Sequence, residues 1–367
     1  MRQIDSVYHL SHTDLDGYAC QFLIAKCFKK IEFANSSYGD EITRRLKTFF
    51  DQMLLENARS ILLLITDLNL NKQQCLYIEE QIEKLQNLKS NITIQAKLLD
   101  HHGSGKDVAA QFSWYYLDTS RSATKITYDW LVDTVGCKTI TKYESLIDAI
   151  NAVDIWLTDK KEFEFGKVLM GAIASSKELG RTLFDDKDRE HKFHLISSAN
   201  NLIDEDNAHI KLDNSMHAIK KAFFVEDRDD NTLDNLIADY LTNLLTTKKD
   251  DLKIFYEDKI GVLTYGIPNI SVIGNAFLVA NPDIDFILNV SPNGSISLRS
   301  NNKADVSEIA STLVGGGGHP NASGGRVSNF KEIFSYIDVK LLITSLIKEK
   351  VKESLCNGQL QQMMKKS

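Results

Sequence analysis

The feature that most constrains this sequence is an apolar run that ends abruptly in charged groups. Residues 92–99 are rich in aliphatic side chains, and Asp100, His101 and His102 follow at once, before the glycine-rich turn 103–105. This pattern predicts a buried strand that delivers polar groups to its carboxyl end, where open α/β sheets bind ligands. Adjacent histidines point in different directions, so one can bind a metal ion while the other faces a substrate. A strand that ends in a solvated turn fits the same residues, and the rest of the chain must decide.

Two earlier strands are predicted to end in the same way, because the apolar runs 7–10 and 61–66 lead into polar residues. The polar residues that follow these runs are His12, Asp14, Asp16 and Asp67. In an extended segment residues two apart point to the same side, so Asp14 and Asp16 would converge. Close carboxylates repel each other unless a cation lies between them. Asp16 is also placed to cap the helix predicted at 18–28, and both roles can hold at once.

Strands and amphipathic helices alternate through the first part of the chain, which predicts an α/β fold with a doubly wound, mostly parallel sheet. The carboxyl ends of parallel strands meet at one edge, so three polar endings favour a shared site. A later helix, 143–153, ends at Asp154, which Ile155 and Trp156 follow. Acids are not favoured at helix C-termini. We therefore expect Asp154 to be partly buried and functional.

The length of 367 residues predicts two domains rather than one. We expect the catalytic domain at 1–186, a polar helical connector at 187–251 and a smaller α/β domain at 252–367. In this second lobe the residues 315–325 include four consecutive glycines, which are costly in regular structure. Such a segment indicates either a flexible linker or a loop whose amides close on an anion, most simply a phosphate. The embedded His-Pro-Asn-Ala favours the anion site.

Composition limits the possible partners. The formal net charge of −7 argues against a surface that coats long nucleic acid, so a nucleic-acid substrate should be short or held locally. The 5 cysteines are scattered without a Cys-x-x-Cys, which indicates free thiols in a reducing compartment. The chain shows neither a signal-peptide core nor an apolar run long enough to span a bilayer. We expect a soluble cytoplasmic protein without a membrane partner.

The strand-end residues together indicate a metal centre. They supply carboxylate oxygens and imidazole nitrogens without a thiolate, and they are too many for one cation. A bridging carboxylate between two divalent ions is an arrangement used for in-line displacement at phosphorus. Imidazoles among the carboxylates favour Mn²⁺ over Mg²⁺, which prefers oxygen ligands. The residues therefore predict a phosphoesterase with two divalent metal ions that closes between two lobes.

These motifs resemble those of the DHH phosphoesterase family. The four ordered matches are residues 12–17 (HTDLDG), Thr66-Asp67, Asp100-His101-His102 and Asp154. Arg299-Ser300 and the residues 315–325 resemble the strand and GGGH loop of the DHH-associated C-terminal domain. The resemblance spans about residues 7–328. It implies hydrolysis of phosphodiesters or phosphoanhydrides with Mn²⁺ or Mg²⁺.

The resemblance also implies a role for each matching residue. Asp14 should serve one metal ion and Asp16 the other, with Asp67 as a bridge. His101 and Asp154 should complete the shell around the ion that Asp16 binds.

The remaining matches would act on the substrate. His102 should face the substrate phosphate, and Asp100 should orient an imidazole. In the second domain Arg299 and His319 should hold a terminal phosphate. The other predicted members of this phosphate site are Ser300, Gly316, Gly317 and Gly318.

The first motif departs from the family. Many members have His-x-x-x-Asp-x-Asp, whereas this chain has His12-x-Asp14-x-Asp16, and His9 lies five residues before Asp14. We favour His12 as the metal ligand, with His9 as the alternative.

The substrate expected from this layout is a short RNA or DNA oligonucleotide or a dinucleotide, as for the nanoRNA-degrading members of the family. Cyclic-dinucleotide phosphodiesterases and single-stranded DNA exonucleases are alternatives within the family. A nucleotide-binding regulatory protein is the alternative without catalysis. The sequence leaves open a homodimer, the polarity of attack and the preference for RNA or DNA.

Overall fold

The computed structural model describes residues 4–225 and 231–364, with some side chains after residue 353 left out. The chain divides into two compact units. Unit 1 comprises Met1–Ser176 and Arg189–Ile219, and unit 2 comprises Lys177–Asp188 and Lys220–Ser367. The residues 187–251, expected as a separate connector, are divided between the two units.

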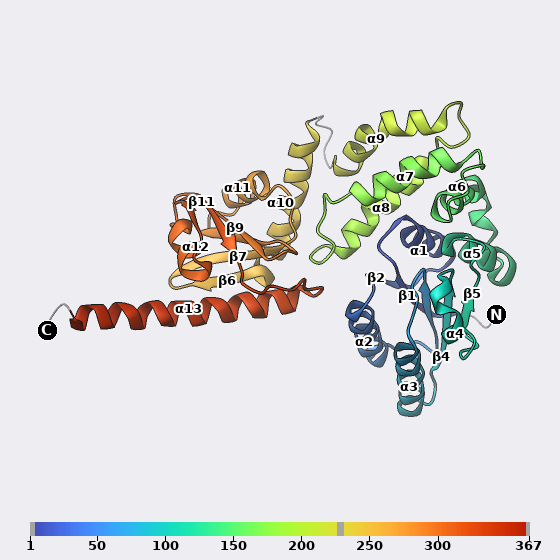
Figure 1. Cartoon of the computed structure of the whole chain (residues 1–367), viewed down its shortest axis with the longest axis horizontal. Helices are drawn as coiled ribbons and strands as arrows, with labels where there is room; N and C mark the ends of the chain where they lie inside the picture. The colour runs from blue at the N-terminus through green and yellow to red at the C-terminus, as the bar shows by residue number, and fades with distance from the viewer. Residues whose placement is uncertain (1–3, 226–230, 365–367) are drawn as a thin grey trace. The chain divides into compact units, whose positions relative to one another are not determined.

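Unit 1 is built on a five-stranded sheet in the order β2-β1-β3-β4-β5, and every neighbouring pair is parallel (Figure 1). Its strands are β1 (Ser6–Ser11), β2 (Ile31–Asn35), β3 (Ser60–Thr66), β4 (Thr93–Asp100) and β5 (Tyr115–Leu117). The first three crossovers contain α1 (Leu15–Cys27), α2 (Asp40–Leu55) and α3 (Lys72–Leu88). The strand order reverses between β1 and β3. In such sheets this switch point is where ligands bind.

Alternate residues of β3 pack on opposite faces of the sheet. Leu62 and Leu64 belong to the core that includes α1, while Leu63 and Ile65 belong to the core that includes α2 and α3. Helices therefore cover both faces, which explains why β3 reads as a continuous apolar run. The predicted doubly wound parallel sheet is confirmed.

The rest of unit 1 is helical and packs mainly on the α1 face. These elements are η1 (Gly103–Gly105), α4 (Lys106–Ala109), α5 (Ala123–Trp130), η2 (Leu131–Val135), η3 (Lys138–Tyr143), α6 (Glu144–Asp154), α7 (Phe163–Ser175), and most of α8 (Asp185–Asn200) and α9 (Ala208–Phe224). The first turn of α8 and the last residues of α9 belong to unit 2. Leu195 and Leu212 of α8 and α9 are fully buried in the same core as Phe22 of α1. This packing assigns most of the expected connector's first half to unit 1.

Unit 2 is a smaller α/β domain with a mixed sheet in the order β10-β11-β9-β8-β7-β6. Its strands are β6 (Lys253–Tyr256), β7 (Lys259–Tyr265), β8 (Phe286–Val290), β9 (Ser295–Ser300), β10 (Gly317–His319) and β11 (Ala322–Arg326). Only the β7–β8 pair is parallel among these described strands. The helices of the unit are α10 (Leu233–Leu252), α11 (Ile270–Ala280), α12 (Val306–Val314) and α13 (Tyr336–Met364).

The glycine run has structural uses that the sequence did not indicate. Gly315 has a φ of 62° and ends α12, with its amide bonded to the carbonyl of Ser311. The amide of Gly316 bonds to the carbonyl of Ala310, and a Cβ at Gly316 would lie 2.2 Å from the carbonyl oxygen of Gly324. Gly317 and Gly318 then lie in the edge strand β10. The run is thus a helix cap followed by a strand rather than an open loop.

The expectation of free thiols throughout is wrong. Cys27 and Cys137 form a disulfide across 110 residues, whereas Cys20, Cys75 and Cys356 are free. The two half-cystines come from α1 and the loop before η3, so only the tertiary fold brings them together. Among the described residues, no helix is both long enough and apolar enough to cross a membrane.

Candidate metal centre

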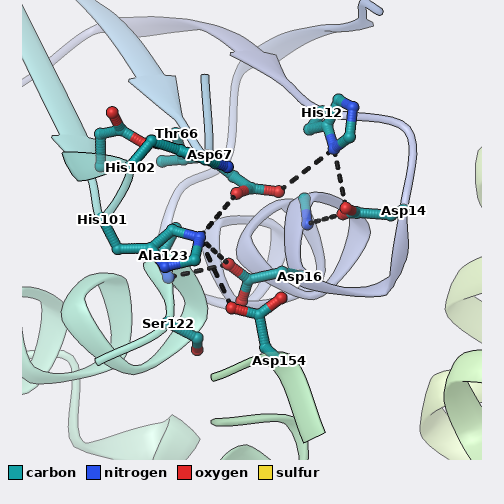
Figure 2. Close-up of polar contacts among 12 residues, drawn as sticks. His12, Asp14, Asp16, Thr66, Asp67, His101, His102, Ser122, Ala123 and Asp154 are labelled. Atoms are coloured by element: carbon teal, nitrogen blue, oxygen red, sulfur yellow. Dashed lines mark hydrogen bonds and ion pairs between the residues drawn. The ribbon is translucent and has the colours of Figure 1, made fainter. Parts of the chain in front are cut away.

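Carboxylates and imidazoles gather at the carboxyl edge of the unit 1 sheet, around the switch point between β1 and β3 (Figure 2). Three overlapping groups have ligand atoms within 4.8 Å of one another. The groups are His12, Asp14 and Asp67; Asp16, His101 and Asp154; and Asp67, His101 and His102. Every residue predicted to bind metal is therefore present in this cluster, and Asp67 and His101 each belong to two groups.

The first group forms where β1 turns into α1. His12 Nδ1 lies 2.8 Å from Asp14 Oδ2 and 3.6 Å from Asp67 Oδ2. Asp14 Oδ1 also accepts the amide of Gly17 at 3.0 Å and so caps α1. Burial works against the charged forms, but the hydrogen bond between His12 and Asp14 lowers the pKa of Asp14 to about 2. The same bond, with Asp67, raises the pKa of His12 to about 10.

His101 is the centre of the second group. Its Nε2 lies 3.8 Å from Asp16 Oδ2, 3.4 Å from Asp67 Oδ1 and 3.5 Å from Asp154 Oδ2. Asp16 is buried and accepts the amides of Ala123 and Thr124, both at 2.8 Å. Asp16 therefore holds the start of α5, whereas Asp14 rather than Asp16 caps α1. The prediction that Asp16 caps the helix directly after it is wrong, because Asp16 instead holds the start of α5, which begins more than 100 residues later.

Asp67 connects the two groups in a strained conformation. Its φ is 55°, in the left-handed region that side chains other than glycine seldom adopt. Its side chain is buried, with Oδ1 facing His101 and Oδ2 facing His12. Burial, together with the nearby charges of Asp14 and Asp16, raises its pKa well above the usual value. Backbone strain of this kind is often held at functional sites, where surrounding contacts keep the residue in place.

The donor set fits divalent cations. The buried oxygens Asp67 Oδ2 and Asp154 Oδ2 have no hydrogen-bond partner among the described residues. Burial and the charge of Asp16 raise the pKa of Asp154 to about 8. Buried carboxylates this close repel each other, and cations between them would remove the repulsion and satisfy the open oxygens. Oxygen and imidazole ligands without thiolate suit Mn²⁺ and Mg²⁺.

His102 is held between Asp100 and Tyr38. Its Nδ1 donates to Asp100 Oδ1 at 2.7 Å, and the buried Asp100 also accepts the hydroxyl of Tyr115 at 2.8 Å. With Nδ1 protonated, Nε2 is the acceptor and receives the hydroxyl of Tyr38 at 3.0 Å. The Tyr38 ring also lies 5.0 Å from the ring of His12. No motif in the sequence points to Tyr38.

The histidine choice in the first motif is clear from the geometry. His12 faces the carboxylates, whereas His9 is fully buried in β1 and its Nε2 contacts Thr66 Oγ1 at 2.9 Å. Burial and the charge of Arg189 lower the pKa of His9 to about 3, so it is a neutral core residue. Gly17 keeps the His12 segment close to α1, since a Cβ there would lie 2.4 Å from the carbonyl oxygen of His12.

The substrate residues predicted in the second lobe lie in unit 2. Arg299 is opposite Ala322, and Ala322 is opposite His319, so Arg299 and His319 project from the same face two strands apart. Arg299 donates to the carbonyl of Leu298 and to Ser271 Oγ, each at 2.7 Å. Ser300 points to the opposite face.

The hydroxyl of Ser300 is engaged inside the unit. It donates to the carbonyl of Asp285 at 2.9 Å and accepts the amide of Ala304 at 3.0 Å. The amide of Gly316 is likewise used within α12, as described above. The structure therefore places Arg299 and His319 on one face of the sheet with β11 between them, and Ser300 on the other face.

Comparison with known proteins adds the family. The chain is 42% identical over 337 residues to a 3′,5′-cyclic-nucleotide phosphodiesterase from Helicobacter pylori, covering 91% of this chain and 96% of the relative. It is also 42% identical to the crystal structure of an uncharacterized protein from Helicobacter pylori G27, with a TM-score of 0.84 and coverage of 94% and 99%. No protein-family model matches the chain, so its resemblance to the DHH family stays a prediction.

Proposed function

The chain belongs to the family of the Helicobacter pylori 3′,5′-cyclic-nucleotide phosphodiesterase, and we propose that it hydrolyses 3′,5′-cyclic nucleotides with two divalent metal ions. Family membership supports an enzyme that cleaves phosphodiester bonds. The observation that carries the metal proposal is the position of the buried, strained Asp67, which belongs to the group of His12 and Asp14 and lies 3.4 Å from His101 of the other group. We assign His12 and Asp14 to one ion and Asp16, His101 and Asp154 to the other.

Divalent ions at these two positions would neutralise the phosphodiester and lower the pKa of an attacking water. The protein's own contribution is the fixed arrangement of its ligands. The amides of Ala123 and Thr124 hold Asp16, and the amide of Gly17 holds Asp14. These hydrogen bonds hold both carboxylates in place, which lowers the entropic cost of binding an ion.

His102 is the proposed contact to the reacting phosphate. Asp100 keeps the proton on Nδ1, so Nε2 can take a proton and then donate to a phosphate oxygen or to the leaving ribose oxygen. In the balanced reaction the water oxygen bonds to phosphorus and gives up a proton, the ring P–O bond breaks, and the departing ribose oxygen gains a proton. The hydroxyl of Tyr38 lies 3.0 Å from Nε2 and can donate a hydrogen bond to this nitrogen while Nε2 carries no proton.

Short oligonucleotides remain a second candidate substrate. The observation in their favour is that Arg299 and His319 project from one face of the unit 2 sheet, with a single strand between them. A terminal phosphate is a group that such a pair could hold. Cyclic mononucleotides have no terminal phosphate, so this feature separates the two candidates.

The test is a substrate panel with metal-stripped protein. Hydrolysis of 3′,5′-cyclic AMP, 3′,5′-cyclic GMP and labelled oligonucleotides of increasing length is measured in chelator, Mn²⁺ or Mg²⁺. We expect turnover of the cyclic nucleotides that requires the metal and is fastest with Mn²⁺. Full activity in chelator would overturn the metal proposal. Turnover of oligonucleotides without turnover of either cyclic nucleotide would overturn the substrate assignment in favour of the second candidate.

A further inference from the structure

A cavity of about 520 Å³ lies in unit 1 beside the first turns of α2 and α3. Its size is within the usual range for pockets that bind small molecules. None of the residues assigned above to the metal ions lines it, and the proposed hydrolysis has so far given it no role.

The cavity is built by the same loops that build the metal centre. Asp67 belongs to the centre and Asn69, two residues later, lines the cavity. In the loop after β4, His102 belongs to the centre and Ser104, two residues later, lines the cavity. Two residues span at most about 7 Å, so the backbone of the cavity residues Asn69 and Ser104 lies within about 7 Å of that of Asp67 and His102. A molecule bound at the centre can therefore extend into the cavity.

The loop after β2 completes this relation. Tyr38 contacts His12 and His102, and its neighbour Gly39 lines the cavity. The loops after β2, β3 and β4 therefore each contain one residue that belongs to the metal centre or contacts its histidines. Each loop also contains a nearby residue that lines the cavity.

The lining of the cavity suits an uncharged, planar, hydrogen-bonding group. Asp40 is the only charged side chain among the lining residues that the structure describes, so the cavity lacks the cations that a phosphate would need. The side chains of Thr43 and Gln73 make no hydrogen bond to other described residues and can serve a ligand. Tyr77 adds an aromatic ring, and Ile42 an apolar wall.

We propose that this cavity binds the nucleobase of a substrate whose phosphate lies at the metal centre. The proposal rests on the proposed function, which places a nucleotide phosphate there. A base offers both donors and acceptors at its edge and a flat face for an aromatic ring. Asp40 would accept an N–H of the base, and Thr43 and Gln73 would supply the remaining polar contacts.

The test fills the cavity from α2. Thr43→Trp places a large ring in the cavity, and Thr48→Trp on the same helix is the matched control, since Thr48 does not line it. Thermal melting of both variants checks that they fold. KM and kcat are measured for 3′,5′-cyclic AMP and for trimethylene phosphate, a cyclic phosphodiester without sugar or base.

We expect Thr43→Trp to raise KM for the cyclic nucleotide by about tenfold or more and to leave trimethylene phosphate within about twofold, because only binding of the base is lost. Thr48→Trp should behave as wild type with both substrates. An unchanged KM for the nucleotide, or an equal loss with both substrates, would overturn the proposal.

A second measurement separates this proposal from the proposed function. Binding of adenosine and guanosine to wild type and to Thr43→Trp is measured by calorimetry, which needs no turnover. Binding that Thr43→Trp abolishes supports the cavity even if cyclic nucleotides are not hydrolysed. Wild type that binds neither nucleoside, or Thr43→Trp that binds as well as wild type, contradicts it.

Discussion

Replacement of Asp67 by asparagine should separate metal binding from folding. The substitution keeps the shape of the side chain and removes the charge that faces both His12 and His101. Asparagine tolerates the left-handed backbone at least as well as aspartate, so the φ of 55° is not an obstacle. Burial and neighbouring acids already oppose the charged form of Asp67 in the metal-free protein. We therefore expect metal-free Asp67→Asn to be as stable as wild type or more stable.

The size of the Tm shift that Mn²⁺ should cause follows from the linkage between binding and folding. A ligand that binds only the folded state at 100 times its Kd stabilises by about 2.7 kcal/mol. A protein unit of this size gains about 2–4 °C in Tm per kcal/mol, so saturating Mn²⁺ should raise the Tm of wild type by about 5–11 °C. Asp67→Asn should show less than about a third of that shift, because the shared ligand is lost.

The assay is thermal unfolding followed by circular dichroism, in chelator and in a Mn²⁺ titration. Asp107→Asn is the control, since this exposed acid in α4 lies outside the metal groups. It should keep the full Mn²⁺ shift. A wild-type shift near zero, or an equal shift in Asp67→Asn, would refute the assignment of Asp67 as a shared ligand.

Three further predictions follow from the structure. Gly17→Ala should lower the free energy of unfolding by about 1–3 kcal/mol and weaken Mn²⁺ binding in a titration, because its Cβ would press on the His12 carbonyl. In chelator, Tm should fall from pH 7 to pH 9. The folded protein holds the pKa of Asp154 at about 8 and that of His12 at about 10, both above their unfolded values, so the stability that these protonated groups contribute is lost as pH rises. A Tm that rises over this range contradicts the electrostatic account. Arg299→Ala should raise KM for oligonucleotides with a terminal phosphate and spare cyclic nucleotides in steady-state kinetics, and equal losses would remove its role in end capture.

The parts of the site that could be predicted from sequence are those encoded locally. Asp67 and the Asp100-His101-His102 group each follow a long apolar run, so their place at a strand end depends only on nearby residues. Parallel pairing then brings these ends to one edge, as the alternation of strands and helices predicted.

The parts that could not be predicted depend on contacts between distant segments. Asp16 finds its backbone donors at Ala123 and Thr124, and Cys27 finds its partner at Cys137. The spacing of residues within one segment cannot predict contacts between residues so far apart in the sequence. Tyr38 was missed for the same reason, since its contacts to His12 and His102 arise only when the ends of β1, β2 and β4 meet.

The glycine run shows a different limit. Its composition favours amides that close on an anion, yet Gly315 and Gly316 use their amides to end α12. Gly317 and Gly318 continue as an edge strand, and a Cβ at Gly318 would lie 2.6 Å from the carbonyl oxygen of Ala322. Close packing of backbones requires glycine as strictly as a ligand does, and composition alone cannot distinguish the two.

Anomalous diffraction from crystals of wild type grown with Mn²⁺ tests the metal centre most directly. We predict two peaks, one among His12, Asp14 and Asp67 and the other among Asp16, His101 and Asp154, about 3.5–4 Å apart as in other two-metal sites. Asp67 should lie between the peaks with one oxygen toward each. A single peak, peaks away from these carboxylates, or no peak at saturating Mn²⁺ would contradict the two-metal assignment.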